Sequence, residues 1–116
     1  MKGVNKLSPS QILQITNILR SLGFSTYLNG TKFINKAIQI YIIINPELFL
    51  MKDIYSELES YYNVSYEQIQ SSIKYSFRKR NITRSKANFS KIFGYEYDDY
   101  IFTAKALIEE IARIVK

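Results

Sequence analysis

Apolar residues recur three or four positions apart along most of the chain, and this spacing most constrains its fold. It matches the 3.6-residue period of an amphipathic helix with one buried face. The first series comprises Ile12, Ile15, Leu19 and Leu22, and the last comprises Ile101, Ala104, Leu107, Ile108, Ile111 and Val115. In 116 residues, this pattern predicts one all-α domain of about six helices and no sheet, over residues 9–116 after an N-terminal tail, residues 1–8.

Local signals predict where the first helices begin and end. Ser8 followed by Pro9 and Gln11 is a capping box with proline at the first helical position, and Gly23 suits a helix end. Residues 24–31 look like a loop with a turn at Asn29-Gly30. Residues 32–44 fit a buried strand or a helix, and their spacing before Pro46 favours a helix.

The second half of the chain contains further helix signals. We expect a short helical piece from residue 45 to 51, a helix over 52–62, another over 66–80, and a short one near 86–92 that ends at Gly94. Asp98 or Asp99 is the expected cap of the last helix.

Residues 52–80 have the pattern of a helix-turn-helix. In the turn, Asn63 tolerates a left-handed backbone, Val64 can fill the angle between the helices, and Ser65 with Gln68 forms a second capping box.

The second helix of this unit has separate apolar and polar sides. Ile69, Ile73 and Phe77 share one stripe on a helical wheel. The other side offers groups that read base edges in a major groove: Gln68, Gln70, Ser71, Lys74 and Tyr75. An ordinary exposed helix shows the same residue types, so this alternative stays open.

The net charge of +6 is concentrated, because residues 68–95 contain seven basic residues and no acid. A polyanion-binding surface and a solvated basic face both fit this run, and cations at residues 78–80 also suit a helix C-terminus. Candidate contacts to DNA phosphates are Ser65, Arg78, Lys79, Arg80, Arg84, Lys86 and Lys91.

Composition argues against several function classes. The chain has no Cys and no His, which removes thiolate nucleophiles, histidine triads and nearly every zinc site. The remaining candidates for catalytic groups are pairs of carboxylates such as Glu57/Glu59 or Asp98/Asp99. These pairs are weak evidence for an active site, so we do not expect an enzyme. We expect no metal, no cofactor and no small-molecule ligand. With no signal peptide and no long apolar run, we expect a cytoplasmic protein without membrane partners.

Several short segments, in order, resemble the C-terminal DNA-binding effector domain of sporulation stage zero protein A, the master response regulator of sporulation in Firmicutes. They are Leu22-Gly23, Leu28-Asn29-Gly30, Lys36-Ala37-Ile38, Ile54-Tyr55, Tyr62-Asn63 and Ser90-Lys91-Ile92-Phe93-Gly94-Tyr95. The resemblance implies six helices, with residues 38–44 helical, and a helix-turn-helix that reads a short A+T-flanked box in double-stranded DNA, often as a homodimer on paired boxes.

The chain departs from that family in its recognition helix. The family has a Glu-Arg pair and a second Arg three residues later, where this chain has Gln70, Ser71 and Lys74. Lysine lacks the bidentate fork of arginine, so we do not expect the family's target sequence. A receiver domain is not expected in residues 1–11, and phosphorylation control is not expected either.

These features predict a stand-alone transcriptional regulator that inserts helix 66–80 into the major groove. An accessory or architectural DNA-binding protein of a plasmid, phage or conjugative element would use the same surface. A protein-interaction module docking through residues 101–115 is a further alternative, although any packed helix shows that stripe.

Overall fold

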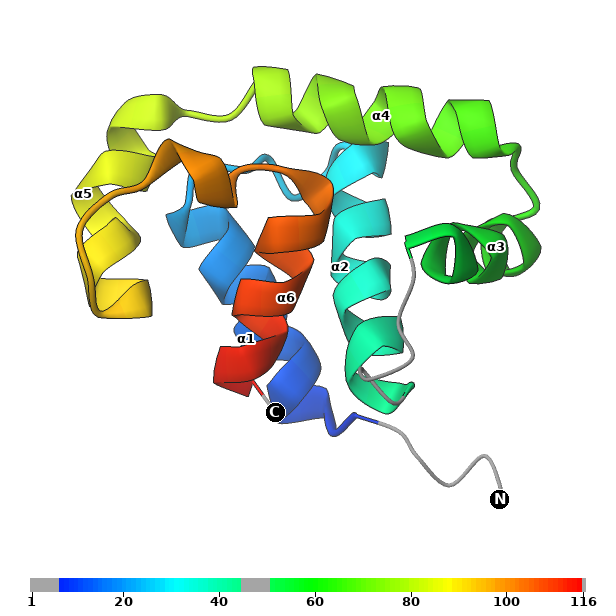
Figure 1. Ribbon diagram of the computed structural model, residues 1–116, viewed down its shortest axis with the longest axis horizontal. Coiled ribbons are helices and arrows are strands. Elements are labelled where there is room, and N and C mark those ends of the chain that lie inside the picture. The colour runs from blue at the N-terminus through cyan, green and yellow to red at the C-terminus, as the bar shows by residue number, and fades with distance from the viewer. Residues whose placement is uncertain (1–6, 45–50, 116) are drawn as a thin grey trace.

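The computed structural model describes residues 7–44 and 51–115, which form α-helices, one 3₁₀ turn and no strand (Figure 1). The elements are α1 (Pro9–Ser21), α2 (Asn29–Ile43), α3 (Met51–Tyr62), α4 (Tyr66–Arg78), α5 (Ile82–Phe93), η2 (Asp99–Ile101) and α6 (Ala104–Val115). The predicted all-α fold is confirmed, and the segment 32–44 is helical up to Ile43, with Ile44 as the extended residue after the helix. Across these ranges, every helix is too short or too polar to cross a bilayer.

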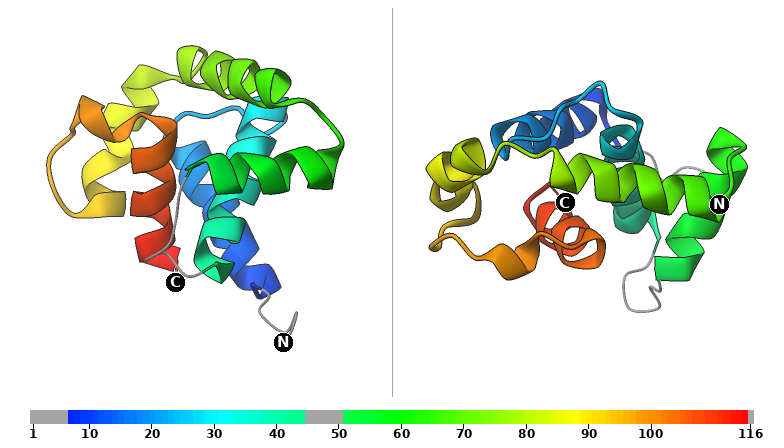
Figure 2. Two further views of the ribbon diagram at one scale, coloured as in Figure 1. Left: turned by 45° about the vertical axis from the view of Figure 1, so that its right-hand side comes forward. Right: turned by 90° about the horizontal axis from the view of Figure 1, so that it is seen from above.

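Helix α4 lies across one end of the molecule, over α2 and the first turn of α6 (Figure 1). Helix α3 lies beneath the start of α4, and α5 runs away from its end (Figures 1 and 2). One apolar core joins all six helices. Its fully buried side chains include Ile15, Ile38, Leu58, Ile69, Phe89 and Ile111.

Helices α2 and α4 approach closely because small residues meet where they cross. A Cβ atom on Gly30 would lie 1.9 Å from the carbonyl oxygen of Ser72 and 2.3 Å from Oγ of Ser76. The buried Thr31 hydroxyl donates to Oγ of Ser76 at 3.3 Å. The turn predicted at Asn29-Gly30 is therefore wrong: the glycine provides space between two helices and belongs to the first turn of α2.

Helix α5 packs against the end of α1 by satisfying its last carbonyl groups, which have no partner within the helix. Four consecutive carbonyls, from Arg20 to Gly23, accept hydrogen bonds from residues of α5 or its cap: Arg84 Nε at 3.0 Å, Asn88 Nδ2 at 2.8 Å, Ser85 Oγ, and Asn81 N at 3.0 Å. Gly23 ends α1 with a φ of 93°, as expected.

Two predicted boundaries in the second half are wrong, and a third, the end of α4, differs slightly from the prediction. Helix α5 is longer than the segment 86–92, because the Asn81 side chain caps it by accepting from the backbone N–H of Arg84. Asp98 caps the turn η2, while Oγ1 of Thr103 accepts from Ala106 at the start of α6. Helix α4 ends at Arg78, short of residue 80. The short helix expected over 45–51 lies outside the described residues, except that Met51 begins α3.

Candidate nucleic-acid interface

The turn between α3 and α4 has the predicted chemistry. Asn63 has a φ of 56°, the left-handed region that asparagine tolerates better than most residues. Oγ of Ser65 accepts from the backbone N–H of Gln68 at 3.1 Å, and the backbone N–H of Ser65 donates to the Gln68 side chain at 3.0 Å. This complete capping box fixes where α4 begins, and residues 63–65 join α3 to α4.

Helix α4 buries one side and presents the other to solvent. Ile69, Ile73 and Ser76 are buried, and Phe77 is half-buried. Ser71, Lys74, Tyr75 and Arg78 are exposed. Seen from above, no described part of the chain covers α4 (Figure 2). We call the solvent side of α4 the outward face, and its exposed residues are Glu67, Gln68, Ser71, Lys74, Tyr75 and Arg78.

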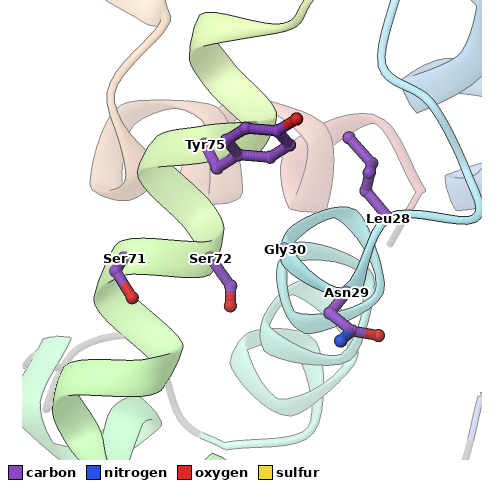
Figure 3. A pocket seen from close by; sticks show the side chains of 6 residues that line it. All are labelled: Leu28, Asn29, Gly30, Ser71, Ser72 and Tyr75. Carbon is purple, nitrogen blue, oxygen red and sulfur yellow. The ribbon is translucent and has the colours of Figure 1, made fainter.

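The predicted base-reading residues lie on both flanks of the outward face. Ser71 and Tyr75 line a groove of about 380 Å³ against Leu28–Gly30 at the start of α2 (Figure 3). Gln70 and Lys74 line a pocket of about 270 Å³ toward α6. Gln68 is exposed, but its side-chain oxygen already accepts the capping bond from Ser65.

The start of α2 is a part of this surface that the sequence does not indicate, because the dipeptide Asn29-Gly30 is typical of a turn. No side chain caps the first N–H groups of α2. The positive end of the helix dipole therefore lies beside α4. Gly30 was the available signal, since a glycine within a helical pattern often marks close packing.

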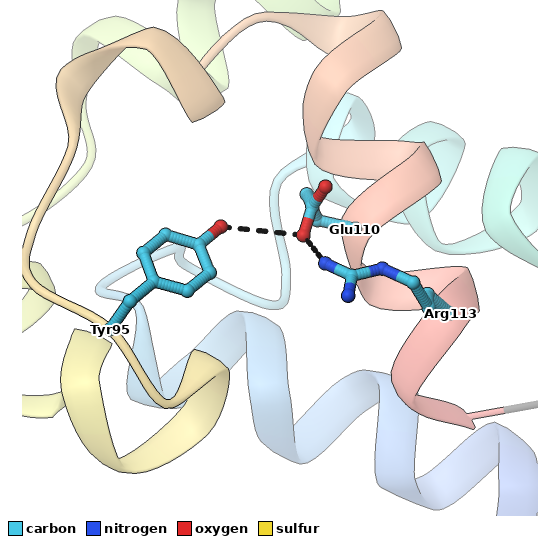
Figure 4. Close-up of polar contacts among 3 residues, drawn as sticks. All are labelled: Tyr95, Glu110 and Arg113. Carbon is cyan, nitrogen blue, oxygen red and sulfur yellow. Dashed lines mark hydrogen bonds and ion pairs between the residues drawn. The ribbon is translucent and has the colours of Figure 1, made fainter.

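The exposed cations at the end of α4 have no carboxylate partner in the part of the chain that the structure describes. Arg78 and Lys79 lie 5.3 and 5.6 Å from the centroid of the Tyr75 ring. Within the described residues, the only ion pair joins Arg113 to Glu110, which also accepts from the Tyr95 hydroxyl at 3.3 Å (Figure 4). That pair lies on α6, so the basic stretch 68–95 keeps its charge unneutralised.

Three predicted phosphate contacts have other surroundings than expected. Arg80 is half-buried over the Phe102 ring, at 3.6 Å, and donates to Ser85 at 2.6 Å and to Tyr97 at 3.3 Å. Arg84 is exposed but donates to the Arg20 carbonyl. Lys91 sits in the last turn of α5, which runs away from α4 (Figure 1).

The remaining predicted phosphate contacts are accessible. Ser65 and Lys86 are exposed, as are Arg78 and Lys79. Nζ of Lys86 lies 5.5 Å from the centroid of the Tyr97 ring. Ser65 already uses its hydroxyl as the cap of α4.

The described residues contain no group of three or more His, Cys, Asp or Glu side chains that could hold a metal ion. Comparison of the chain with protein-family models, with characterised proteins and with solved structures finds no match.

Proposed function

We propose that this chain is a sequence-specific double-stranded DNA-binding protein that regulates transcription and inserts α4 into the major groove. The outward face of α4 carries the proposal. It combines hydroxyl, amide and cationic side chains with one acid, Glu67, on one uncovered helix, and no carboxylate of the described residues pairs with the cations that follow. A B-DNA major groove about 12 Å wide admits one such helix.

The roles follow from the surroundings of each side chain. Ser71, Lys74 and Tyr75, with Gln70 at the edge, contact base edges, because they lie along the middle of α4. Arg78, Lys79 and Lys86 hold phosphates, because they are exposed cations at or beyond its end. Phosphate contacts supply most of the affinity and base contacts supply the sequence preference.

The resemblance to the sporulation effector domain supports this proposal and suggests binding as a homodimer on paired boxes. Gln70, Ser71 and Lys74 replace the family's base-reading pattern, so the box is expected to be different. Glutamine pairs well with adenine, and lysine makes a less selective contact than arginine does to guanine.

The first test measures the affinity for duplex DNA as a function of salt. With about six phosphate contacts, three from each copy of a homodimer, affinity should fall ~10³-fold between 50 and 200 mM salt. Absence of binding at low salt would contradict the proposal.

The second test selects binding sites from random duplexes for the wild type and for single variants. Lys74→Ala and Tyr75→Ala should blunt sequence preference, each costing about 1–3 kcal/mol on the preferred box. Lys79→Ala should weaken all sequences alike and reduce the salt slope by about 1. Arg113→Ala is the charge-matched control, because Arg113 lies in the last turn of α6, at the far end of the molecule from α4 (Figure 1).

The selection also separates two kinds of DNA-binding protein. A defined box supports a regulator. Strong binding without a box, together with DNA bending, would favour the accessory or architectural role. Equal effects of the Lys74 and Lys79 variants on preference would contradict the assigned reading face.

A further inference from the structure

The pocket between α4 and the start of α6 combines an apolar wall with polar groups. Its volume is about 270 Å³, near the lower end for small-molecule sites. Ile73, Phe77, Phe102 and Ala104 supply the apolar wall. Gln70 and Lys74 line it from α4, so it lies directly against the outward face.

Tyr55 adds a hydroxyl group to the residues that line this pocket. The residue is only 8% exposed and lines the pocket, and no other residue of the described ranges hydrogen-bonds its hydroxyl. A tyrosine hydroxyl normally finds a partner when it is fully buried, and this one keeps contact with solvent. Burial raises the pKa of this hydroxyl, and Tyr66 raises it further, so the group stays protonated and can donate.

The charge of the pocket wall is positive. Lys74 is exposed, and among the residues that the structure describes it has no carboxylate partner and is the only charged one that lines the pocket. Thr103 and Ala104 bring the first turn of α6, and with it the positive end of a helix dipole, to the same wall. A carboxylate could pair with the lysine, accept a hydrogen bond from the neutral tyrosine hydroxyl and lie near the positive end of α6. The aromatic side chains of the wall could pack against an apolar group of the same ligand.

We propose that this pocket binds a small carboxylate with an aromatic body, and that its occupation competes with DNA for Lys74. The carboxylate pairs with the Lys74 ammonium and accepts from the Tyr55 hydroxyl, while the ring lies against Phe77 and Phe102. The competition with DNA rests on the proposed function, whereas the ligand site itself does not.

The test titrates ¹⁵N-labelled protein with phenylacetate and with indole-3-acetate. We expect saturable shifts of the amide signals of Gln70, Lys74, Thr103 and Ala104 in the millimolar range or below. Acetate, inorganic phosphate and benzyl alcohol provide only the charge or only the ring, and each should bind at least about 10-fold more weakly.

Variants locate the site. Lys74→Gln should weaken phenylacetate binding about 10-fold or more, since hydrogen bonds to charged groups are the stronger kind. Tyr55→Phe should weaken it about 3- to 10-fold while keeping the ring that packs against Tyr66. The matched controls are Lys105→Gln and Tyr62→Phe, which remove the same groups from residues that do not line the pocket.

The outcomes separate the two proposals. Saturable phenylacetate binding that weakens in both variants but in neither control supports the site, even if no DNA is bound. Absence of saturable shifts, or equal binding by the wild type and both variants, would overturn it. If duplex DNA binds, phenylacetate should lower the affinity of the wild type more than that of Tyr55→Phe, and equal lowering would overturn the competition.

Discussion

Lys79 and Arg80 are neighbours in the sequence, but their side chains have different surroundings. Lys79 is exposed at the end of α4, with its ammonium near the Tyr75 ring. Arg80 turns inward over Phe102, and its Nε atom is buried without a partner. Arg80 therefore ties the end of α4 to the segment that precedes α6, and its charge is less available to DNA than that of Lys79.

We expect Arg80→Ala to destabilise the fold and Lys79→Ala to leave it unchanged. The first variant removes two hydrogen bonds and the packing of a long side chain on Phe102, and should cost about 1–3 kcal/mol. The second removes an exposed side chain, with an effect within about 0.5 kcal/mol. Urea unfolding measures both free energies, and DNA affinity should fall in Lys79→Ala without loss of stability. An equally stable Arg80→Ala would contradict the structural role.

The sequence could not distinguish these two cations, although it correctly predicted residues whose role is local. Asn63, Ser65 and Gln68 form the predicted turn and cap, because their partners lie within three residues along the chain. The partners of Arg80 lie at Tyr97 and Phe102, far along the chain, and local spacing carries no signal for them.

At the scale of elements, the sequence predicted helix positions better than helix contacts. Helical periodicity and proline or glycine signals placed α1, α3 and α4 within about two residues. The start of α2 was missed, because Gly30 looks like a turn residue until α4 is seen to cross it. The groove between α4 and α2 and the pocket between α4 and α6 also depend on how these helices pack, which local spacing does not reveal.

We expect Gly30→Ala to destabilise the protein, opposite to the effect of helix propensity. Propensity alone would favour alanine by up to about 1 kcal/mol. The added methyl group would overlap the backbone of Ser72 and Oγ of Ser76, and overpacking of this kind costs about 1–3 kcal/mol. Thermal unfolding measures the net effect, and a higher melting temperature would contradict the close crossing of α2 and α4.

Gly94→Ala is the matched control for this prediction. Gly94 has a φ of 82°, but a Cβ atom there meets nothing within 4 Å. Gly94→Ala should therefore lower the free energy of unfolding by about 1 kcal/mol, which is the cost of placing alanine in a left-handed backbone conformation. If Gly30→Ala also shifts the amide NMR signals of α4, the close crossing of α2 and α4 determines where the outward face lies.

At the scale of the whole molecule, the composition limits how stability depends on pH. The chain has neither His nor Cys, the side chains that ordinarily titrate between pH 6 and 9. It has ten tyrosines, and burial raises the pKa of Tyr55 and of Tyr62. Neighbouring tyrosines, Tyr66 and Tyr61 respectively, raise these two pKa values further.

These raised pKa values predict a loss of stability at alkaline pH. Above about pH 10, tyrosines of the unfolded chain release protons that Tyr55 and Tyr62 retain in the folded protein. The unfolded state then binds fewer protons than the folded state, so the free energy of unfolding decreases as pH rises. Urea unfolding should give a nearly constant free energy of unfolding from pH 6 to 9 and a falling one above pH 10.

The double variant Tyr55→Phe/Tyr62→Phe should lose less stability above pH 10, whereas Tyr100→Phe, at an 87% exposed residue, should match the wild type. Identical alkaline slopes for the wild type and the double variant would show that other groups cause the loss.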